Sequence, residues 1–297
     1  MSEDTFKSGF VSIIGMPNAG KSTLYNALMG EKLAIINPKA QTTRHRILGV
    51  KNGDGFQIIY SDTPGILRKT SYGMHEKMMK VVNESLEDSD VLVLLLDIHG
   101  RDFSEEIRLK FEGSKAKKIV ALNKIDNSNQ EELVKKLSWL KETFEAEVYL
   151  PISAQEGFQL DVLEKYIVDF LPIHPPYYPE DQLTDRSERF FVNEIIRNNI
   201  LKLYEEEIPY ASEVVTLSFK EEEKIIRLHC EVILERPSQK PIVIGRNGAG
   251  IKRLGIESRK ELETFLGKQV YLELFVKVRD DWRNNKTMLK QFGYDTE

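Results

Sequence analysis

The chain has 297 residues, enough for two domains, and its 41% apolar and 30% charged residues are ordinary for a globular protein. A net charge of −5 argues against nucleic-acid binding over the whole surface, and a single cysteine rules out an internal disulfide. No apolar run reaches the roughly 18 residues of a membrane-spanning helix. The polar start MSEDTFKSG is also unlike a signal peptide. We therefore expect a protein of a reducing compartment such as the cytoplasm.

Between residues 6 and 173, apolar strand patterns alternate with helical patterns. The expected strands are residues 10–14, 46–51, 56–60, 91–98, 118–124 and 147–152. The expected helices are residues 21–29, 74–86, 103–111, 130–144 and 160–170. This alternation predicts an α/β domain with a mixed, mostly parallel sheet that helices cover on both faces.

The segment LPIHPPYYPEDQLTDRS, residues 171–187, contains four prolines, which prevent a helix and stiffen an extended connection. We expect a linker at residues 174–187. The patterns that follow are a helix at 188–204, strands at 213–220 and 225–234, a glycine-rich turn, a helix at 251–265 and a strand at 270–278. They predict a smaller α+β domain at residues 188–280, followed by a C-terminal tail at 281–297.

The stretch GMPNAGKST fits the phosphate-loop motif G-x-x-x-x-G-K-[ST], and it stands between an expected strand and an expected helix, as that motif requires. Backbone N–H groups of such a loop, together with the helix N-terminus, can hold phosphates. Lys21 can reach the β and γ phosphates, and Ser22 can offer its hydroxyl to Mg²⁺. The nucleotide-binding residues expected here are Gly15, Met16, Pro17, Asn18, Ala19, Gly20, Lys21, Ser22 and Thr23.

The stretch SDTPG, at the end of an expected strand, places Asp62 and Gly65 in a D-x-x-G arrangement about 40 residues after Lys21. Asp62 can hold Mg²⁺ through a water molecule, and the Gly65 N–H can contact a γ phosphate. We add Thr63 and Pro64 of the same loop to the expected nucleotide site.

The stretch NPKAQTTRHR lies between these two motifs and supplies a threonine that can complete the Mg²⁺ shell. Thr43 is our first choice and Thr42 the alternative. A loop that the γ phosphate orders, and that is released after hydrolysis, is a switch. Arg44 and His45 are expected to be solvent-facing residues of that switch and not catalysts.

The stretch NKID follows another expected strand and indicates which base is bound. Asp126 can accept hydrogen bonds from the N1–H and 2-amino groups of guanine, a pair that adenine lacks. The stem of Lys124 can cover the base, and Asn123 can brace the loops. In PISAQEG, the backbone of Ser153 and Ala154 can meet the guanine O6. The alternatives are an ATPase or a nucleoside kinase with a phosphate loop, and neither needs a set of groups that recognises guanine.

The stretch VIGRNGAGIKRLG contains a G-x-x-G turn, and residues 236–260 carry seven Lys or Arg against one Glu. Such a turn is the one with which KH modules clamp about four single-stranded nucleotides. The alternative is a glycine-capped helix with a solvated basic face. The expected RNA-binding residues are Gly245, Arg246, Asn247, Gly248, Lys252 and Arg253.

Five motifs in this order resemble GTPases of the translation-factor class. With PKAQTTRHR and ERPSQKPIVIG, the chain from about residue 6 to 294 resembles the Era family of bacterial GTPases. The resemblance implies a type II KH domain, hydrolysis of GTP held with Mg²⁺, and a monomer. It further implies binding to the 3′ end of 16S ribosomal RNA in the maturing small (30S) subunit. The family is also described as associating peripherally with the inner membrane, although this chain shows no amphipathic anchor that requires it.

The family lacks the glutamine that orients the attacking water in Ras-like GTPases, and this chain has Ile66 at that position. Hydrolysis is therefore expected to be slow without a partner or a monovalent cation. Asn18 matches the asparagine with which related GTPases bind K⁺, although it can equally serve only to shape the loop. We expect Lys21, Thr43, Gly65 and Asn18 to be the catalytic residues. The rival hypothesis is an RNA-binding assembly protein in which the nucleotide is mostly structural.

Overall fold

The computed structural model describes residues 5–67, 69–100 and 105–294. The chain divides into two compact units. The first contains residues up to 70 together with 75–185, and the second contains residues 71–74 together with those from 186 onward.

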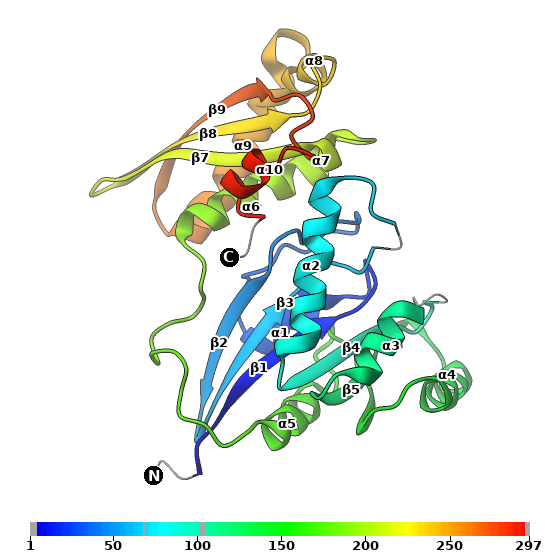
Figure 1. Cartoon of the computed structure of the whole chain (residues 1–297). Helices are drawn as coiled ribbons and strands as arrows, with labels where there is room; N and C mark the ends of the chain where they lie inside the picture. The colour runs from blue at the N-terminus through cyan, green and yellow to red at the C-terminus, as the bar shows by residue number, and fades with distance from the viewer. Residues whose placement is uncertain (1–4, 68, 101–104, 295–297) are drawn as a thin grey trace. The chain divides into compact units, whose positions relative to one another are not determined.

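The first unit is an α/β domain built on a six-stranded sheet of order β2-β3-β1-β4-β5-β6 (Figure 1). Its strands are β1 (Lys7–Ile14), β2 (Ile47–Gly53), β3 (Phe56–Asp62), β4 (Val91–Asp97), β5 (Lys117–Asn123) and β6 (Val148–Pro151). Its helices are α1 (Lys21–Met29), α2 (Gly73–Asp88), α3 (Glu105–Gly113), α4 (Gln130–Thr143) and α5 (Leu160–Phe170). Only the β2–β3 pair is antiparallel, so the predicted mixed, mostly parallel sheet is confirmed. Residues 103 and 104 of the expected helix at 103–111 lie outside the described residues.

The sheet is buried on both faces, which is why β4 contains the continuous apolar run VLVLLL before Asp97. Helices α2, α3 and α4 cover one face, where Val82, Phe111 and Leu140 pack against Leu94 and Val120. Helix α1 contacts β1, β3 and α5. In a parallel sheet the carboxyl ends of the strands meet at one edge, so the loops after β1, β3 and β5 converge there.

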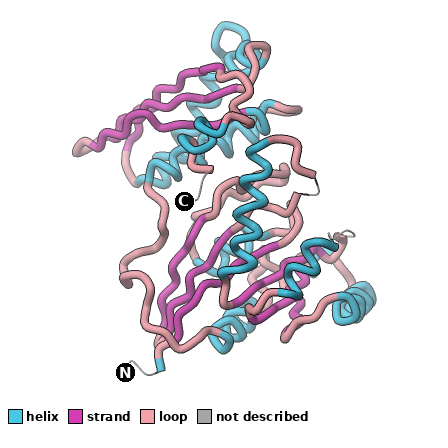
Figure 2. The backbone as a smooth tube through the Cα atoms, in the orientation of Figure 1, coloured by secondary structure: helices cyan, strands magenta, loops and turns pink. Residues whose placement is uncertain are grey.

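The proline-rich connection is held by hydrogen bonds to strands β2 and β3 of the first unit. Val50 of edge strand β2 donates its N–H to the Leu183 carbonyl at 2.9 Å. The buried amide of Gln57 accepts the N–H groups of Tyr177 and Tyr178 at 2.8 and 3.0 Å, and it donates to the Tyr178 carbonyl at 2.8 Å. Figure 2 draws this segment as loop throughout. The expected linker at 174–187 is therefore divided, because its residues up to 185 belong to the first unit.

The second unit has a three-stranded sheet of order β7-β8-β9, in which β8 is antiparallel to β7 and parallel to β9. Its strands are β7 (Ser212–Glu221), β8 (Ile225–Leu234) and β9 (Gln269–Val278), and its long helices are α6 (Glu188–Leu203) and α9 (Ala249–Leu266). Three short helices were not expected: α7 (Ile208–Ala211), α8 (Gln239–Ile244) and α10 (Lys286–Gln291). They are too short to show a helical period, and α7 and α8 each contain a proline.

The expected tail at 281–297 packs into the second unit as far as it is described. Trp282 is fully buried, and its indole N–H donates to the Ala211 carbonyl at 3.0 Å. Tyr294 is buried too, and its hydroxyl donates to the Glu213 carboxylate. Trp282 is therefore a packing anchor of the second unit, while residues 295–297 lie outside the described residues. Among the described residues, no helix has the length and apolarity needed to cross a membrane.

Candidate nucleotide and RNA sites

The loop after β1 is formed by glycines that have no room for a side chain. A Cβ on Gly15 would lie 2.4 Å from the Leu95 carbonyl oxygen, and one on Gly20 would lie 2.4 Å from the Asn123 amide nitrogen. Gly20 also has a φ of 98°, in the region that favours glycine. Helix α1 follows with no side-chain cap and no acidic residue in its first turn. Its first N–H groups and its positive end are therefore available to an anion.

Lys21 is the cation of this loop, and it is almost entirely buried. Its ammonium donates to the carbonyls of Gly15 and Met16 at 3.1 and 3.0 Å. Burial lowers the pKa of Lys21 to about 8, and the Asp62 carboxylate offsets this only in part. A phosphate bound next to this buried amine would strongly stabilise its protonated, charged form.

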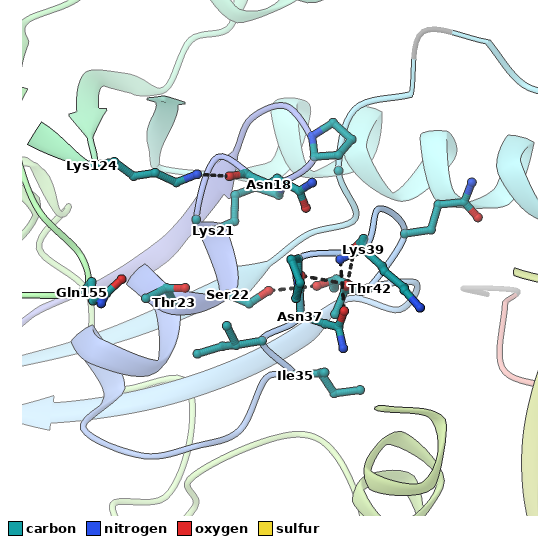
Figure 3. Close-up of a pocket in the computed structure, with 17 residues that line it drawn as sticks. Asn18, Lys21, Ser22, Thr23, Ile35, Asn37, Lys39, Thr42, Lys124 and Gln155 are labelled. Atoms are coloured by element: carbon teal, nitrogen blue, oxygen red, sulfur yellow. Dashed lines mark hydrogen bonds between the residues drawn. The ribbon is translucent and has the colours of Figure 1, made fainter. Parts of the chain in front are cut away.

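Three oxygen donors from separate segments meet at the start of α1. The Ser22 hydroxyl lies 2.9 Å from the Asp62 carboxylate and 2.9 Å from the Thr43 hydroxyl. The Thr43 hydroxyl donates to the same carboxylate at 3.2 Å. Thr42 turns the other way, since its hydroxyl donates to the Lys39 and Asn37 carbonyls (Figure 3). Of the two threonines considered, the structure thus places Thr43 with the expected metal ligands.

A cavity of about 390 Å³ opens over this loop. Of the expected nucleotide-site and metal-site residues, those lining it are Pro17, Asn18, Gly20, Lys21, Ser22, Thr23, Thr43, Gly65 and Lys124. Expected residues outside the lining are Gly15, Met16, Ala19, Asp62, Thr63, Pro64, Asn123, Asp126, Ser153 and Ala154. Thr63 serves the fold, because its hydroxyl donates to the Ile13 carbonyl at 2.8 Å. Sequence reasoning missed the other lining residues, which lie within or beside stretches already singled out: Ile35, Ile36, Asn37, Pro38, Lys39, Gln41 and Gln155.

The loop after β5 is held by the side chain of Asn123, which is buried. Its amide donates to the Ala19 carbonyl at 2.8 Å and accepts from the Ala154 N–H at 2.9 Å. Asn123 therefore joins three loops of the site. The exposed Asp126 accepts a hydrogen bond from the Ser153 hydroxyl at 2.6 Å, which orients its carboxylate.

The backbone N–H groups expected to meet a guanine O6 have partners within the protein. Ser153 donates its N–H to the Phe158 carbonyl at 3.3 Å, and Ala154 donates to Asn123 as described. The Ser153 side chain instead contacts Asp126, to which its hydroxyl donates. Gln155, the next residue, lines the cavity in their place.

Arg44 and His45 are buried, with 1% and 9% exposure, so the expectation that they face solvent is wrong. The Thr43 side chain before them is hydrogen-bonded to Ser22 at the start of α1, and β2 begins at Ile47, two residues after His45. The short segment between these two fixed points is therefore buried.

Ile66 is 1% exposed and belongs to the apolar cluster under α2, α3 and α4.

The second glycine turn lies between α8 and α9. Gly245 has a φ of 72°, Asn247 a φ of 51° and Gly248 a φ of 79°, so three of four residues have positive φ. A Cβ on Gly250 would lie 2.6 Å from the Val243 carbonyl oxygen, so a further glycine that was not singled out lets α8 and α9 pack closely. Helix α9 has no side-chain cap and no acidic residue in its first turn. Arg246 and Asn247 are exposed at the tip.

A groove of about 380 Å³ continues from this turn between α9 and β9. Its lining includes the cations Lys252 and Arg259 together with Ile256, Tyr271 and further apolar side chains. Tyr271 is 47% exposed and therefore presents a ring to solvent. Within the described residues, Arg259 has a carboxylate partner, Glu263, at 3.9 Å.

The expected RNA-binding cations differ in where they lie. Lys252 lines the groove, whereas Arg253 does not. In the described part of the chain, neither of them nor Arg246 forms an ion pair. Such cations can meet phosphates without first giving up a carboxylate partner.

Comparisons with known proteins agree with this geometry. Residues 10–124 match the family model described as a 50S ribosome-binding GTPase, and residues 207–283 match a KH domain. The chain is 42% identical over 296 residues to the GTPase Era of Syntrophus aciditrophicus, covering 98% of this chain and 96% of that protein. The chain belongs to the Era family of GTPases. It is also 39% identical to the chloroplastic ERA-like GTPase of Oryza sativa, over 98% of this chain and 70% of that one.

Solved Era structures are similar over nearly the whole chain. An Aquifex aeolicus Era variant bound to GDP and AlF4⁻ matches 98% of this chain and 100% of its own, with a TM-score of 0.93 and 39% identity. Era in complex with MgGDPNP and nucleotides 1506–1542 of 16S ribosomal RNA covers the same shares, with a TM-score of 0.92 and 38% identity. The resemblance to the Era family is thereby confirmed.

Proposed function

We propose that this Era-family GTPase uses the GTP cycle to control its binding to the 3′ region of 16S ribosomal RNA, and that it assists maturation of the small ribosomal subunit. One observation carries the proposal. An Era structure that holds both MgGDPNP and a 16S fragment is similar to 98% of this chain, and this chain has chemistry suited to each ligand. The role also places the protein in the cytoplasm, where ribosomal subunits are assembled.

One comparison names the 50S ribosome, and another names 16S ribosomal RNA, which is the RNA of the small subunit. The model described as 50S ribosome-binding matches residues 10–124 alone, which form part of the first unit. The relative with a 16S fragment matches both units. Because the RNA turn lies in the second unit, we assign the small subunit as the partner.

The oxygen donors around Ser22 fit Mg²⁺. Two hydroxyls and one carboxylate lie within 3.2 Å of one another, and Mg²⁺ prefers a few hard oxygen ligands together with phosphates and water. When bound, the ion neutralises charge on the β and γ phosphates. Ser22 and Thr43 would bind it directly, and Asp62 would do so through water. Because Thr43 belongs to the switch, its bond to the ion would tie that segment to the GTP-bound state.

The remaining groups of the site suit phosphate binding better than water activation. Lys21 would stabilise negative charge on the phosphates, and the Gly65 N–H would contact the γ phosphate. The Ile66 side chain is buried among apolar side chains and has no polar atom with which to orient a water. We therefore propose slow intrinsic hydrolysis that depends on help from outside these side chains.

Asn18 is our candidate for that help, through K⁺. It lines the phosphate cavity, and its φ of 63° is one that asparagine tolerates better than most residues. The test compares GTP hydrolysis by wild type and Asn18→Ala in K⁺ and in Na⁺. Loss of a K⁺-specific rate increase in the variant supports the proposal. Equal rates for both proteins in K⁺ reduce Asn18 to a loop-shaping residue.

The RNA assignment rests on the exposed turn and the groove beside it. Arg246 and Lys252 would meet phosphates, and Tyr271 with the apolar side chains of the groove would receive bases. The decisive experiment is crosslinking of the protein to RNA in cells, with sequencing of the bound RNA. The wild type is compared with a variant carrying Arg246→Asp and Asn247→Asp. Reads that gather at the 3′ end of the small-subunit RNA and vanish in the variant are the expected result. Reads spread over unrelated RNAs, or unchanged in the variant, would overturn the RNA assignment.

The rival function is an RNA-binding assembly protein whose nucleotide is structural, and the bond from Asn123 that braces the phosphate loop is compatible with it. It predicts that GDP and GTP give equal RNA affinity.

A competition experiment tests the base assignment itself: ATP is expected not to displace labelled GDP, because Asp126 has no partner on adenine.

A further inference from the structure

Lys124 is held in place from two sides. It has a φ of 65°, a backbone conformation that is unusual for a lysine. Its side chain lines the nucleotide cavity. Beyond the cavity its ammonium donates to the Asn18 carbonyl at 2.7 Å (Figure 3) and to the Asp97 carboxylate at 2.7 Å. The stem of Lys124 is therefore fixed at both ends, by the backbone and by these two acceptors.

Asp97 is the last residue of β4, and no motif in the sequence marks it. The strand register pairs Asp97 with Asn123, and the Ile98 N–H donates to the Asn123 carbonyl at 3.1 Å. The other carboxylate oxygen of Asp97 accepts the His99 N–H at 2.9 Å. The sheet thus positions this carboxylate directly beside the loop that carries the base-binding residues, and the His99 bond orients it.

Asp97 has a second cation nearby, but that cation is bonded elsewhere. The Lys136 ammonium donates to the Gly100 carbonyl at 2.7 Å and lies 4.3 Å from the centre of the Trp139 ring. Burial lowers the pKa of Lys136, and the Asp97 charge offsets this only in part. The hydrogen-bonded cation of Asp97 is therefore Lys124 and not Lys136.

We propose that Asp97 is a positioning residue of the guanine-nucleotide site, whose carboxylate holds the Lys124 ammonium so that the lysine stem forms a wall of the base pocket. This inference rests on the proposed base site. A lysine stem left without its anchor would lose part of its fixed orientation, and the bound nucleotide would have to restore it. Such preorganisation changes mainly the rate at which a ligand leaves.

The central test is a double-mutant cycle on GDP binding in the full chain, with excess Mg²⁺ and a fluorescent GDP. Asp97→Ala is expected to speed GDP dissociation about tenfold, since the lost bond is charge-assisted but the pair is partly exposed to water. Asp97→Asn keeps a hydrogen-bond acceptor, so GDP dissociation from this variant is expected to be only about threefold faster than from the wild type. Lys124→Met keeps most of the stem and removes the ammonium. In the Lys124→Met background, Asp97→Ala is expected to have no further effect.

Glu147→Gln is the matched control. Glu147 is also a partly exposed carboxylate at a strand of this sheet with a lysine partner, Lys117, at 3.4 Å, but it lines none of the cavities at the nucleotide site. Its GDP kinetics are expected to match those of the wild type. If Asp97→Ala folds poorly, as judged by melting of the nucleotide-free protein, Asp97→Asn completes the cycle.

A second measurement separates positioning from direct base recognition. In the proposed arrangement the lysine stem packs on the face of the purine and does not touch the 2-amino group. Asp97→Ala should therefore weaken GDP and IDP by the same factor. Additive effects in the cycle, unequal factors for the two nucleotides, or wild-type kinetics in Asp97→Ala would each overturn the inference. Failure of the wild type to prefer GDP over ADP would instead overturn the proposed base site.

Discussion

The two glycine turns of this protein share a local design. Each precedes a helix whose capping glycine has positive φ, 98° at Gly20 and 79° at Gly248. Neither helix has a side-chain cap or an acidic residue in its first turn. Both turns therefore present free N–H groups and the positive end of a helix, which are the features that phosphates require.

Their surroundings differ. The first turn is enclosed, because a Cβ on Gly15 or Gly20 would meet other atoms at 2.4 Å and Lys21 is buried behind the loop. At the second turn nothing lies within 4 Å of a Cβ on Gly248, and Arg246 is exposed. An enclosed turn can surround the compact end of a polyphosphate. An open one can receive a chain that continues past it on both sides, as RNA does.

The largest effect is expected where the enclosed turn loses its space. Gly15→Ala places a Cβ against the backbone oxygen of Leu95, so either the loop or β4 must shift. Overpacking of this kind costs about 3 kcal/mol, and GDP affinity should fall about 100-fold in a fluorescence titration. Gly30→Ala is the control, because its Cβ meets nothing within 4 Å although its φ is 72°. It should keep wild-type affinity, and a Gly15→Ala protein that binds GDP normally would refute the enclosure.

At the open turn, charge should matter more than space. Lys252→Ala removes a groove cation that has no ion pair within the described residues, and RNA affinity should fall about tenfold. The slope of log affinity against log salt should drop by about 0.7, as for one phosphate contact on a single strand. Lys260→Ala is the matched control, since Lys260 pairs with Glu257 at 3.0 Å on the same helix. Equal losses for the two variants, measured with a 16S 3′ oligonucleotide, would show that position on the helix is irrelevant.

The enclosed turn should also respond to pH. Burial lowers the pKa of Lys21 to about 8, so the nucleotide-free protein loses this proton above that pH, whereas the phosphates favour the charged form. GDP affinity should therefore fall as pH rises, by about fourfold between pH 7 and pH 8.5, with proton uptake on binding. Calorimetry in two buffers of different ionisation enthalpy measures that uptake. Lys21→Arg, which does not titrate in this range, should show a flat profile, and an unchanged profile in wild type would contradict the assignment.

The smallest effect is expected for Gly248→Ala. The added Cβ has open space, and only the positive φ is strained, which should cost about 1 kcal/mol of the free energy of unfolding. Urea unfolding measures this cost. Gly245→Ala should be worse, because its Cβ would lie 2.7 Å from the Gly250 backbone nitrogen. If Gly248→Ala and Gly245→Ala lower the free energy of unfolding by the same amount, a side chain has no more room at Gly248 than at Gly245. The second turn would then be less open than its comparison with the first turn implies.

Much of the site follows from local sequence, because a phosphate loop and a G-x-x-G turn are each made by a few consecutive residues. The pattern predicted α1 at its observed bounds and the strands of the first unit to within three residues. The grouping of Ser22, Thr43 and Asp62 could also be predicted from the sequence. Each residue belongs to a different motif, and these motifs occur in a fixed order along the chain. What the pattern predicted least well was side-chain burial, as Arg44 and His45 illustrate.

The sequence by itself determined the fold class, the two glycine turns and the family of this protein, because these depend on residue types at short, fixed spacings. Only the tertiary structure decided that Gln57 binds the proline-rich segment to the sheet, and that Tyr294, near the C-terminus, lies in the second unit beside Glu213. It alone placed Asp97 against Lys124. Each of these contacts joins residues at least 27 positions apart, and a side chain's partner at such a distance is chosen by how the chain folds and not by its neighbours in sequence.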